Sequence, residues 1–354
     1  MPRAGRRTAF TAGLVLPALL VVSTVLADVG AGAPRPGPGA PAHHTGRGFR
    51  NLSPDYAYPI LERAVRAADR LLDGPTDRGR PPAVLPNDGA ALRANGTAAT
   101  ITWVGHATFL VQIDGVNLLT DPIWSERTGP LPLLGPRRLL PPGLRFEDLP
   151  PIHGVLISHD HYDHLDLPTV RRLAAEHRPT FFVPLGLRAW LEAEAGVRDV
   201  VELDWWQTAA FRGLTIACTP AQHSSGRSLH DQNRRLWSSW SVLGRQRRFF
   251  FAGDTGYYPG FQEIGGRFGP FDVAAIPIGG YGDWDSHPNH VNPEEAVQLF
   301  EDVRGRLLVP MHWGTFALNR ESFREPPARL FREALRRGLE ERIALLAPGE
   351  TIHW

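Results

Sequence analysis

The sequence predicts an α/β domain in which strands come first and helices separate the later strands. Short apolar runs rich in branched and aromatic residues recur from residue 100 onward, and amphipathic segments with helix-start signals alternate with the later runs. This alternation favours a layered α/β fold over an all-β one. In 354 residues with 42% apolar and 21% charged side chains, a large core can be buried. The formal net charge of +1 offers no basic excess for phosphates, so we expect no nucleic-acid partner.

Residues 1–33 are predicted to be a signal peptide or an N-terminal membrane anchor. Arg3, Arg6 and Arg7 precede an uncharged stretch over residues 8–27, and small residues that fit a cleavage site follow it. The uncharged stretch is also about as long as a short membrane span. We therefore expect an exported, extracytoplasmic protein, either periplasmic or secreted, or one anchored by this segment.

The segment after this leader is predicted to be a linker. Residues 34–54 are rich in Pro and Gly and unsuited to core packing, so we expect the folded domain over residues 55–354. A first helix is expected over Tyr58–Leu72, where apolar residues fall on one face. The first strands are expected over Ile101–Val104, Thr108–Ile113 and Val116–Leu119, with Asp114-Gly115 as a hairpin turn.

Strands and helices alternate in the rest of the chain. Pro168 can open a helix at its first position, and Asn292 can cap another in which Pro293 and Glu295 complete a capping box. A further helix is expected over Pro327–Leu339. The expected strands are Val155–Ser158, Phe181–Val183, Val200–Leu203, Leu214–Thr219, Leu236–Leu243, Arg248–Ala252, Val273–Pro277, Leu307–Pro310 and Ile343–Leu346.

The segment Ser158-His159-Asp160-His161-Tyr162-Asp163-His164 predicts a metal site. It follows an apolar strand directly, so it lies on a loop at the carboxyl end of a strand, where α/β proteins usually build their sites. Three imidazoles and two carboxylates this close together are costly to place anywhere except in solvent or around a metal. Imidazole and carboxylate both suit a borderline ion such as zinc.

Three more candidate ligands follow expected strands elsewhere in the chain. They are His223, Asp254 and His312, each just past the end of a strand. One loop cannot complete two coordination spheres, so we expect these residues to join it. Cys218 is the only cysteine, which excludes a thiolate site, and we expect it to be a buried, unreactive thiol.

This arrangement is similar to the metallo-β-lactamase superfamily, in which an HxHxDH motif is followed by a His, an Asp and a His, each at a strand end. Over about residues 100–318 the chain more closely resembles the N-acylphosphatidylethanolamine-hydrolysing phospholipase D family. The matching stretches are Trp103-Val104-Gly105-His106-Ala107-Thr108, Leu119-Thr120-Asp121-Pro122-Ile123, Leu156-Ile157-Ser158-His159, Tyr162-Asp163-His164-Leu165-Asp166, Leu236-Trp237 through Ser241, Phe251-Ala252-Gly253-Asp254-Thr255-Gly256-Tyr257 and His312-Trp313-Gly314-Thr315-Phe316.

The resemblance implies a fold and a ligand set. The fold would be a metallo-β-lactamase αββα sandwich with the site along one edge. Two Zn²⁺ ions per chain would be bound, although the same ligands would also accept manganese or iron. Asp121 would orient the metal loop without binding metal. The first ion would be held by His159, His161 and His223, and the second by Asp163, His164 and His312, with Asp254 bridging both.

The resemblance also implies a reaction. A hydroxide activated by two metals would hydrolyse a phosphodiester, as in the phospholipase D branch, with Asp163, Asp254 and His290 as the catalytic residues. His290, just before a helix, could bind phosphate or protonate the leaving group, or it could be structural. His106 could line the pocket or simply pack.

Alternatives stay open for the role of one insertion, for the substrate and for whether the protein is an enzyme. The insertion Ile123–Phe146 mixes leucines with arginines, which suits either contact with an anionic membrane surface or ordinary loop packing. Asp283 and Asp285 stand near a position where the family usually has an Arg-Trp pair, and they would repel a phosphate. The substrate could therefore be a phospholipid, a small phosphodiester or an ester such as a lactone, and a non-catalytic binding protein is the least favoured alternative.

Overall fold

The computed structural model describes residues 39–53, 79–130, 135–228, 230–282, 289–316, 318 and 321–354. Its contacts divide the chain into two units, Met1–Arg47 and Gly48–Trp354. The first unit contains the short strand β1 (His44–Thr45), and the second begins with β2 (Gly48–Phe49). The predicted leader or anchor and the predicted helix Tyr58–Leu72 lie outside the described residues. Within the described residues, no helix is long and apolar enough to cross a membrane.

One sheet of the second unit has seven strands. Their order is β15 (Thr351–His353), β3 (Thr100–Gly105), β4 (Thr108–Ile113), β5 (Val116–Thr120), β6 (Gly154–Leu156), β7 (Thr180–Pro184) and β8 (Val200–Leu203). The pairs from β15 to β5 are antiparallel, and those from β5 to β8 are parallel. Asp114 and Gly115 form the turn between β4 and β5 with φ values of 51° and 76°, which is the left-handed backbone that a two-residue hairpin loop needs.

A second sheet has six strands. Their order is β14 (Gly305–Met311), β13 (Phe271–Pro277), β12 (Arg248–Phe251), β11 (Ser239–Leu243), β10 (Leu214–Thr219) and β9 (Thr208–Phe211). The strands from β9 to β12 pair antiparallel, and β12, β13 and β14 are parallel. The carboxyl ends of β12, β13 and β14 therefore meet at one edge of this sheet.

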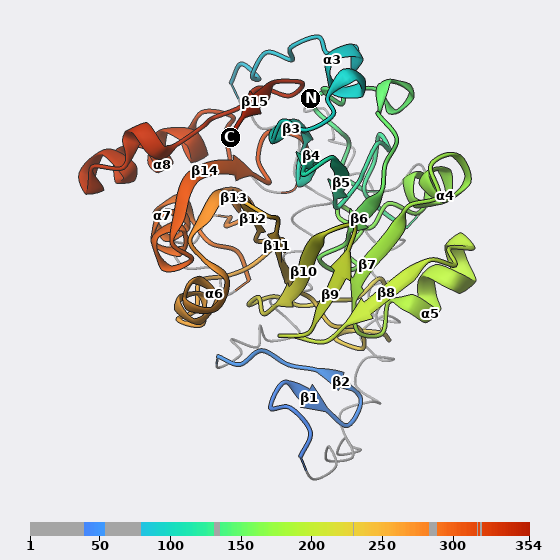
Figure 1. Ribbon diagram of the computed structural model, residues 1–354. Helices are drawn as coiled ribbons and strands as arrows, with labels where there is room; N and C mark the ends of the chain where they lie inside the picture. Colours follow the sequence, from blue (N-terminus) through green and yellow to red (C-terminus); the bar gives the residue numbers. More distant parts are fainter. Residues whose placement is uncertain are drawn as a thin grey trace, which may run out of the picture. The chain divides into compact units, whose positions relative to one another are not determined.

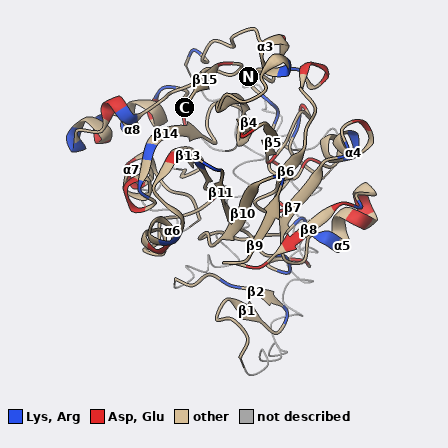
Figure 2. Cartoon of the chain, viewed as in Figure 1, with Lys and Arg blue, Asp and Glu red and all other residues tan. Residues whose placement is uncertain are grey.

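Helices cover the outer faces of both sheets. Figure 1 shows α4 (Leu167–Glu176) and α5 (Arg188–Trp190) beside the seven-stranded sheet, and α6 (Phe261–Phe268), α7 (Pro293–Asp302) and α8 (Glu325–Arg337) beside the six-stranded one. Charged residues are concentrated on these helices, whereas the strands carry few (Figure 2). The remaining elements are α3 (Ala90–Ala94), the 3-10 turns η2 (Phe146–Asp148) and η4 (Glu340–Arg342), and the π-helical turn η3 (Leu191–Ala195).

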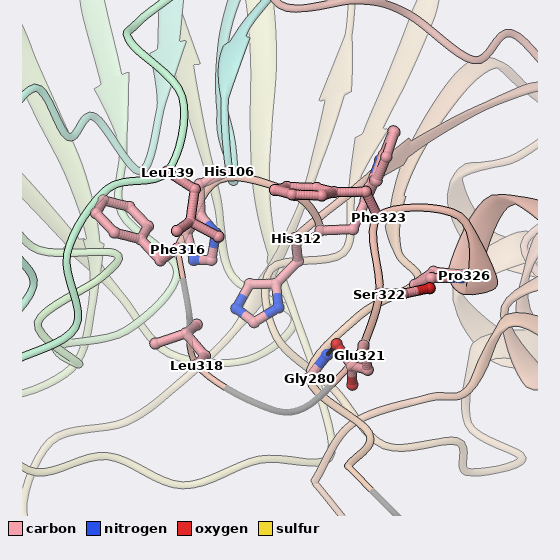
Figure 3. A pocket seen from close by; sticks show the side chains of 12 residues that line it. His106, Leu139, Gly280, His312, Phe316, Leu318, Glu321, Ser322, Phe323 and Pro326 are labelled. Atoms are coloured by element: carbon pink, nitrogen blue, oxygen red, sulfur yellow. Dashed lines mark hydrogen bonds between the residues drawn. The ribbon is translucent and has the colours of Figure 1, made fainter. Parts of the chain in front are cut away.

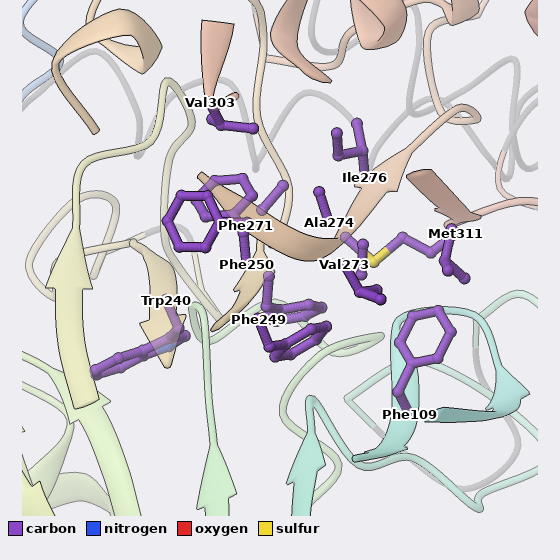
Figure 4. Packing of buried hydrophobic residues seen from close by; sticks show 14 of the residues in the cluster. Phe109, Trp240, Phe249, Phe250, Phe271, Val273, Ala274, Ile276, Val303 and Met311 are labelled. Atoms are coloured by element: carbon purple, nitrogen blue, oxygen red, sulfur yellow. The ribbon is translucent and has the colours of Figure 1, made fainter. Parts of the chain in front are cut away.

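Two cores hold these layers together. In β4, Phe109, Val111 and Ile113 join the large cluster that also contains the inner residues of the six-stranded sheet, including Phe249. Figure 4 shows Phe109 among these residues. The intervening Leu110 joins a second cluster with residues of α4. Because the sheet is buried on both faces, most positions of its strands are apolar, and the polar positions of β3, β4 and β5 are buried as well. The layers are those of the expected αββα sandwich.

Most of the expected elements are present. The capping box of α7 is confirmed, because the side chain of Asn292 accepts from the Glu295 backbone and the Glu295 carboxylate accepts from the Asn292 backbone. The strand predicted over Ile343–Leu346 is wrong. Ile343 makes only an isolated bridge to Leu308, and the last strand is β15, which pairs with β3.

Candidate metal centre

The seven predicted metal ligands converge on one place, although they come from both sheets. The loop that carries His159, His161, Asp163 and His164 follows β6 of the seven-stranded sheet. The other three, which are His223, Asp254 and His312, follow β10, β12 and β14 of the six-stranded sheet.

Three imidazoles form one half of the centre. His159 Nε2 lies 2.9 Å from His161 Nδ1, and His223 Nε2 lies 3.2 Å from the same atom. The ligand atoms of the three residues lie within 4.8 Å of one another, as those of a single ion would. This is the group that the sequence assigned to the first metal.

Two carboxylates and two imidazoles form the other half. Asp163 Oδ2 lies 3.5 Å from His164 Nε2 and 3.4 Å from His312 Nε2. Asp254 Oδ2 lies 3.1 Å from His164 Nε2 and 3.2 Å from His312 Nε2. The same oxygen of Asp254 is 3.8 Å from His223 Nε2 in the first half. Asp254 therefore stands between the two groups, where a bridging ligand would be.

The donor geometry fits metal ions. Tetrahedral zinc with bonds of about 2.0–2.1 Å separates its ligand atoms by about 3.3 Å, close to most of the distances above. Among the described residues, His164 Nε2, His312 Nε2 and Asp254 Oδ1 are buried and have no hydrogen-bond partner. Buried polar atoms without partners are costly, and bound cations would supply partners for them.

Hydrogen bonds on the outer side hold most of the imidazoles in the required tautomer. His164 Nδ1 lies 2.6 Å from Asp121 Oδ2, and His223 Nδ1 lies 2.8 Å from the Asn289 carbonyl oxygen. His312 Nδ1 lies 3.3 Å from the Gly279 carbonyl oxygen. Carboxylate and carbonyl oxygens only accept, so each Nδ1 carries the proton and each Nε2 keeps its lone pair for a ligand.

Asp121 fixes the metal loop, as the resemblance implied. Its carboxylate accepts from the Ser158 backbone N–H at 2.7 Å and from the Ser158 hydroxyl at 2.5 Å. The Ser158 oxygen in turn lies 2.9 Å from His159 Nδ1. Asp121 is fully buried and has φ of 32°, a backbone conformation that non-glycine residues rarely adopt. This strain is offset by the hydrogen bonds that the carboxylate makes to the loop.

The electrostatics favour ionised carboxylates in the centre. Burial alone would raise the pKa of Asp254, but the imidazoles of His164 and His312 outweigh burial and hold that pKa well below its ordinary value. The pKa of Asp163 is also held well below its ordinary value, again against the effect of burial and mainly by His164. Burial lowers the pKa of His223 to about 3. Against the effect of burial, Asp254 and Asp163 raise the pKa of His312 to about 9 and that of His164 well above its ordinary value. Because a ligand imidazole must be neutral, bound cations would displace a proton from each of these two histidines.

A second group of hydrogen bonds holds the same loop on its side away from the centre. The side chain of Asp160 points away from the centre and accepts from the Gly226 backbone at 2.7 Å and from the Arg235 guanidinium. Arg227 donates to the carbonyl oxygens of Asp160 and Leu165, both at 2.8 Å. The sequence analysis missed these roles, because no local pattern marks two arginines far along the chain.

Asn51 is a further residue that the sequence analysis missed. It lies within the predicted linker, yet it is buried. Its side chain donates to the His223 carbonyl oxygen at 2.8 Å and accepts from the His223 backbone N–H at 3.0 Å. These two bonds fix the backbone of a candidate ligand. A lone Asn in a Pro- and Gly-rich stretch carries no signal that could have revealed this contact.

His290 and His106 both lie at the centre. His290 Nδ1 is 3.9 Å from Asp254 Oδ2, its ring centroid is 5.1 Å from that of His223, and its side chain is 17% exposed. His290 can therefore reach both the centre and the solvent. His106 Nε2 lies 3.0 Å from Asp163 Oδ2. Both histidines also belong to groups whose ligand atoms lie within 4.8 Å of one another.

A small pocket lies beside His106 and His312. Figure 3 shows the His312 ring between Phe316 and Leu318 on one side and Glu321 on the other. The Glu321 carboxylate accepts from the backbone N–H groups of Gly280 at 3.1 Å and Gly282 at 3.0 Å. Asp283 and Asp285, which were expected to disfavour phosphate, lie outside the described residues. Half of the residues that line the pocket are apolar, namely Leu139, Trp313, Phe316, Leu318, Phe323 and Pro326.

The insertion Ile123–Phe146 is largely packed where it is described. Leu140 and Leu144 are buried. Arg138 donates to the carbonyl oxygens of Ser125 and Ile123 and lies over the Phe316 ring. Residues 131–134, with three of the leucines, lie outside the described residues. These contacts support loop packing for the described part, while exposed Leu139 lines the pocket.

Comparisons with known proteins identify relatives of this chain. Residues 116–313 match the family model described as a beta-lactamase superfamily domain. An uncharacterized protein of Mycobacterium tuberculosis is 41% identical, over 86% of this chain and 82% of its own length. N-acyl-phosphatidylethanolamine-hydrolyzing phospholipase D 1 of Caenorhabditis elegans is 44% identical, over 65% of this chain and 68% of its own length. The solved structure of Igni18, a metallo hydrolase from Ignicoccus hospitalis, has a TM-score of 0.54 at 25% identity and covers 73% of this chain and 99% of its own.

Proposed function

Because this chain belongs to the β-lactamase superfamily and is a metal-dependent hydrolase, we propose that it cleaves a phospholipid phosphodiester of the N-acylphosphatidylethanolamine type. The observation that carries this proposal is the pair of adjoining ligand groups with Asp254 between them, because two ions held there would neutralise charge on the oxygens of a phosphodiester. The leucine and aromatic side chains beside the candidate ligand His312 would offer an acyl chain an apolar contact. The name of the worm relative supports the same substrate class.

We assign the binding of two ions to the seven residues predicted from the sequence. One ion would be held by His159, His161 and His223, and the other by Asp163, His164 and His312. Asp254 would be shared by both ions. When bound, such ions activate water and neutralise charge that develops on phosphoryl oxygens. Zinc fits the donor set, which contains no thiolate.

The proposed reaction is a hydrolysis at phosphorus. A water oxygen bonds to phosphorus, the bond between phosphorus and the ethanolamine oxygen breaks, and the leaving oxygen takes up a proton. The products are phosphatidic acid and an N-acylethanolamine. We assign the protonation of the leaving oxygen to His290, which lies at the centre and is partly exposed. The apolar side chains beside His312 would contact the acyl chain.

The proposal is tested with purified, zinc-loaded protein and N-acylphosphatidylethanolamine in mixed micelles. In H₂¹⁸O we expect the label in phosphatidic acid and none in the N-acylethanolamine, because water attacks phosphorus. The Asp254→Asn protein serves as the control for contaminating lipases. A panel of lactones runs in parallel. Rapid turnover of lactones with no cleavage of the phosphodiester would reject the proposed substrate while leaving the hydrolase assignment intact.

A further inference from the structure

His106 is held in place by the segment that follows β14. It lies in the tight turn between β3 and β4 with φ of 55°. Its backbone N–H donates to the Thr315 hydroxyl at 2.7 Å. Its carbonyl oxygen accepts from Trp103 Nε1 at 3.0 Å and from the His312 backbone N–H at 3.2 Å. The turn is therefore tied to the segment that carries a candidate ligand.

The side chain of His106 is aimed at one ligand of the centre. The residue is 1% exposed, and Nε2 lies 3.0 Å from Asp163 Oδ2. The ring lies against His312, with centroids 4.1 Å apart, and meets Phe316 edge-on at 5.2 Å. Because an ionised carboxylate can only accept, His106 Nε2 is the donor in this bond.

We propose that His106 is a positioning residue that orients Asp163 as a ligand of the second metal ion. The oxygen that accepts from His106 is the same Oδ2 that faces His164 Nε2 and His312 Nε2. A carboxylate oxygen has two lone pairs, so one can accept from His106 while the other is directed into the centre. Because His312 and Phe316 pack against the ring, we expect the His106 side chain to keep its orientation.

Loss of the His106 side chain should affect only one half of the centre. Among the described residues, His106 forms hydrogen bonds to Asp163 but none to His159, His161 or His223. Outer partners of this kind change metal affinity by about 10- to 100-fold. Loss of the His106 side chain should therefore weaken the second metal site and leave the three-imidazole site intact. This inference rests on the proposed metal centre, but it does not depend on the substrate.

The test compares metal binding by His106→Ala, His106→Gln and the wild type. Each metal-free protein is titrated with Zn²⁺ in competition with a chromophoric chelator, which resolves the two affinities without any assay of activity. We expect His106→Ala to bind the second ion about 10- to 100-fold more weakly and the first ion as the wild type does. The Gln variant can place an amide N–H near the position of Nε2, so we expect it to regain most of the lost affinity.

His153→Ala is the matched control. His153 is a half-buried histidine whose Nδ1 accepts from the Asn117 backbone at 2.9 Å, away from the centre, so both affinities should stay unchanged. Wild-type affinity for both ions in His106→Ala would overturn the inference. Two results together would make His106 a ligand instead. The Gln variant would fail to restore binding, and X-ray absorption of its cobalt-loaded form would show one imidazole fewer around the metal. A wild-type protein that binds no metal would reject the proposed function itself.

Discussion

Gly253 offers a sharp test of how closely the two halves of the centre are packed. It immediately precedes Asp254 and has φ of 60°, in the left-handed region. A Cβ at this position would lie 2.6 Å from Ser158 Cβ and 2.9 Å from the Ser238 carbonyl oxygen. Ser158 is the residue before His159, so a methyl group here would push apart two ligand-bearing segments.

The loss of unfolding free energy in Gly253→Ala has a backbone part and a packing part, and a matched control variant separates them. The left-handed backbone costs an alanine about 1–2 kcal/mol, and overpacking of a rigid site adds about 1–3 kcal/mol. Gly338, at the end of α8, has φ of 68° and open space around its Cβ position. Gly338→Ala should therefore show the backbone cost alone. The reduced entropy of the unfolded chain affects both variants equally and cancels in their difference.

Urea unfolding of the metal-free proteins measures these free energies without a contribution from bound metal. We expect Gly253→Ala to lose about 2–5 kcal/mol, and at least 1 kcal/mol more than Gly338→Ala. Such a loss is a large part of the usual total of about 5–15 kcal/mol. Metal titration should also show weaker binding in Gly253→Ala only. Equal stability losses in the two variants, with unchanged metal binding, would refute the close packing described between Gly253 and Ser158.

Three further predictions concern the centre and the core. Elemental analysis should find close to two ions per chain, most of them zinc, and chelation should abolish activity until zinc is restored; active protein without metal would contradict the centre. Asp254→Asn should lower kcat by about two to three orders of magnitude, because the substitution removes charge shared by both halves of the centre. Wild-type turnover in a metal-loaded Asp254→Asn protein would exclude Asp254 from the centre. Cys218 is buried and burial raises its pKa, so a thiol reagent should label it only as the protein unfolds; rapid labelling of the native protein would disagree.

The strands and the convergence of the candidate ligands were largely predictable because local patterns encode them. Thr108–Ile113, Val200–Leu203 and Leu214–Thr219 form strands with the predicted bounds, since burial on one or both faces selects apolar and branched residues. The HxHxDH loop is recognisable because the ligands lie close together in sequence. Strand ends then pointed to the remaining ligands, which the structure brings to the same edge.

Other features depend on partners that are distant in the sequence. Helix α6 was missed because Gly265 and Gly266 disfavour a helix. A Cβ on Gly265 would lie 2.2 Å from the Asp302 carbonyl oxygen, so packing against the end of α7 requires this glycine. Strand β15 was missed because its few, mostly polar residues become a strand only through pairing with β3. The bond between Asp160 and Arg235 likewise joins residues with no shared local pattern.

The origin of the ligands in two different sheets has a consequence for how the protein assembles. His223, Asp254 and His312 cannot meet the loop after β6 until both sheets have formed and docked, so a partly folded chain has no complete site. A bound ion therefore acts as a non-covalent cross-link that selects the fully docked state. At a free metal concentration of 100 times Kd, each site would add about 2.7 kcal/mol to that state alone. Metal supply would then control how much folded enzyme accumulates as well as how fast it works.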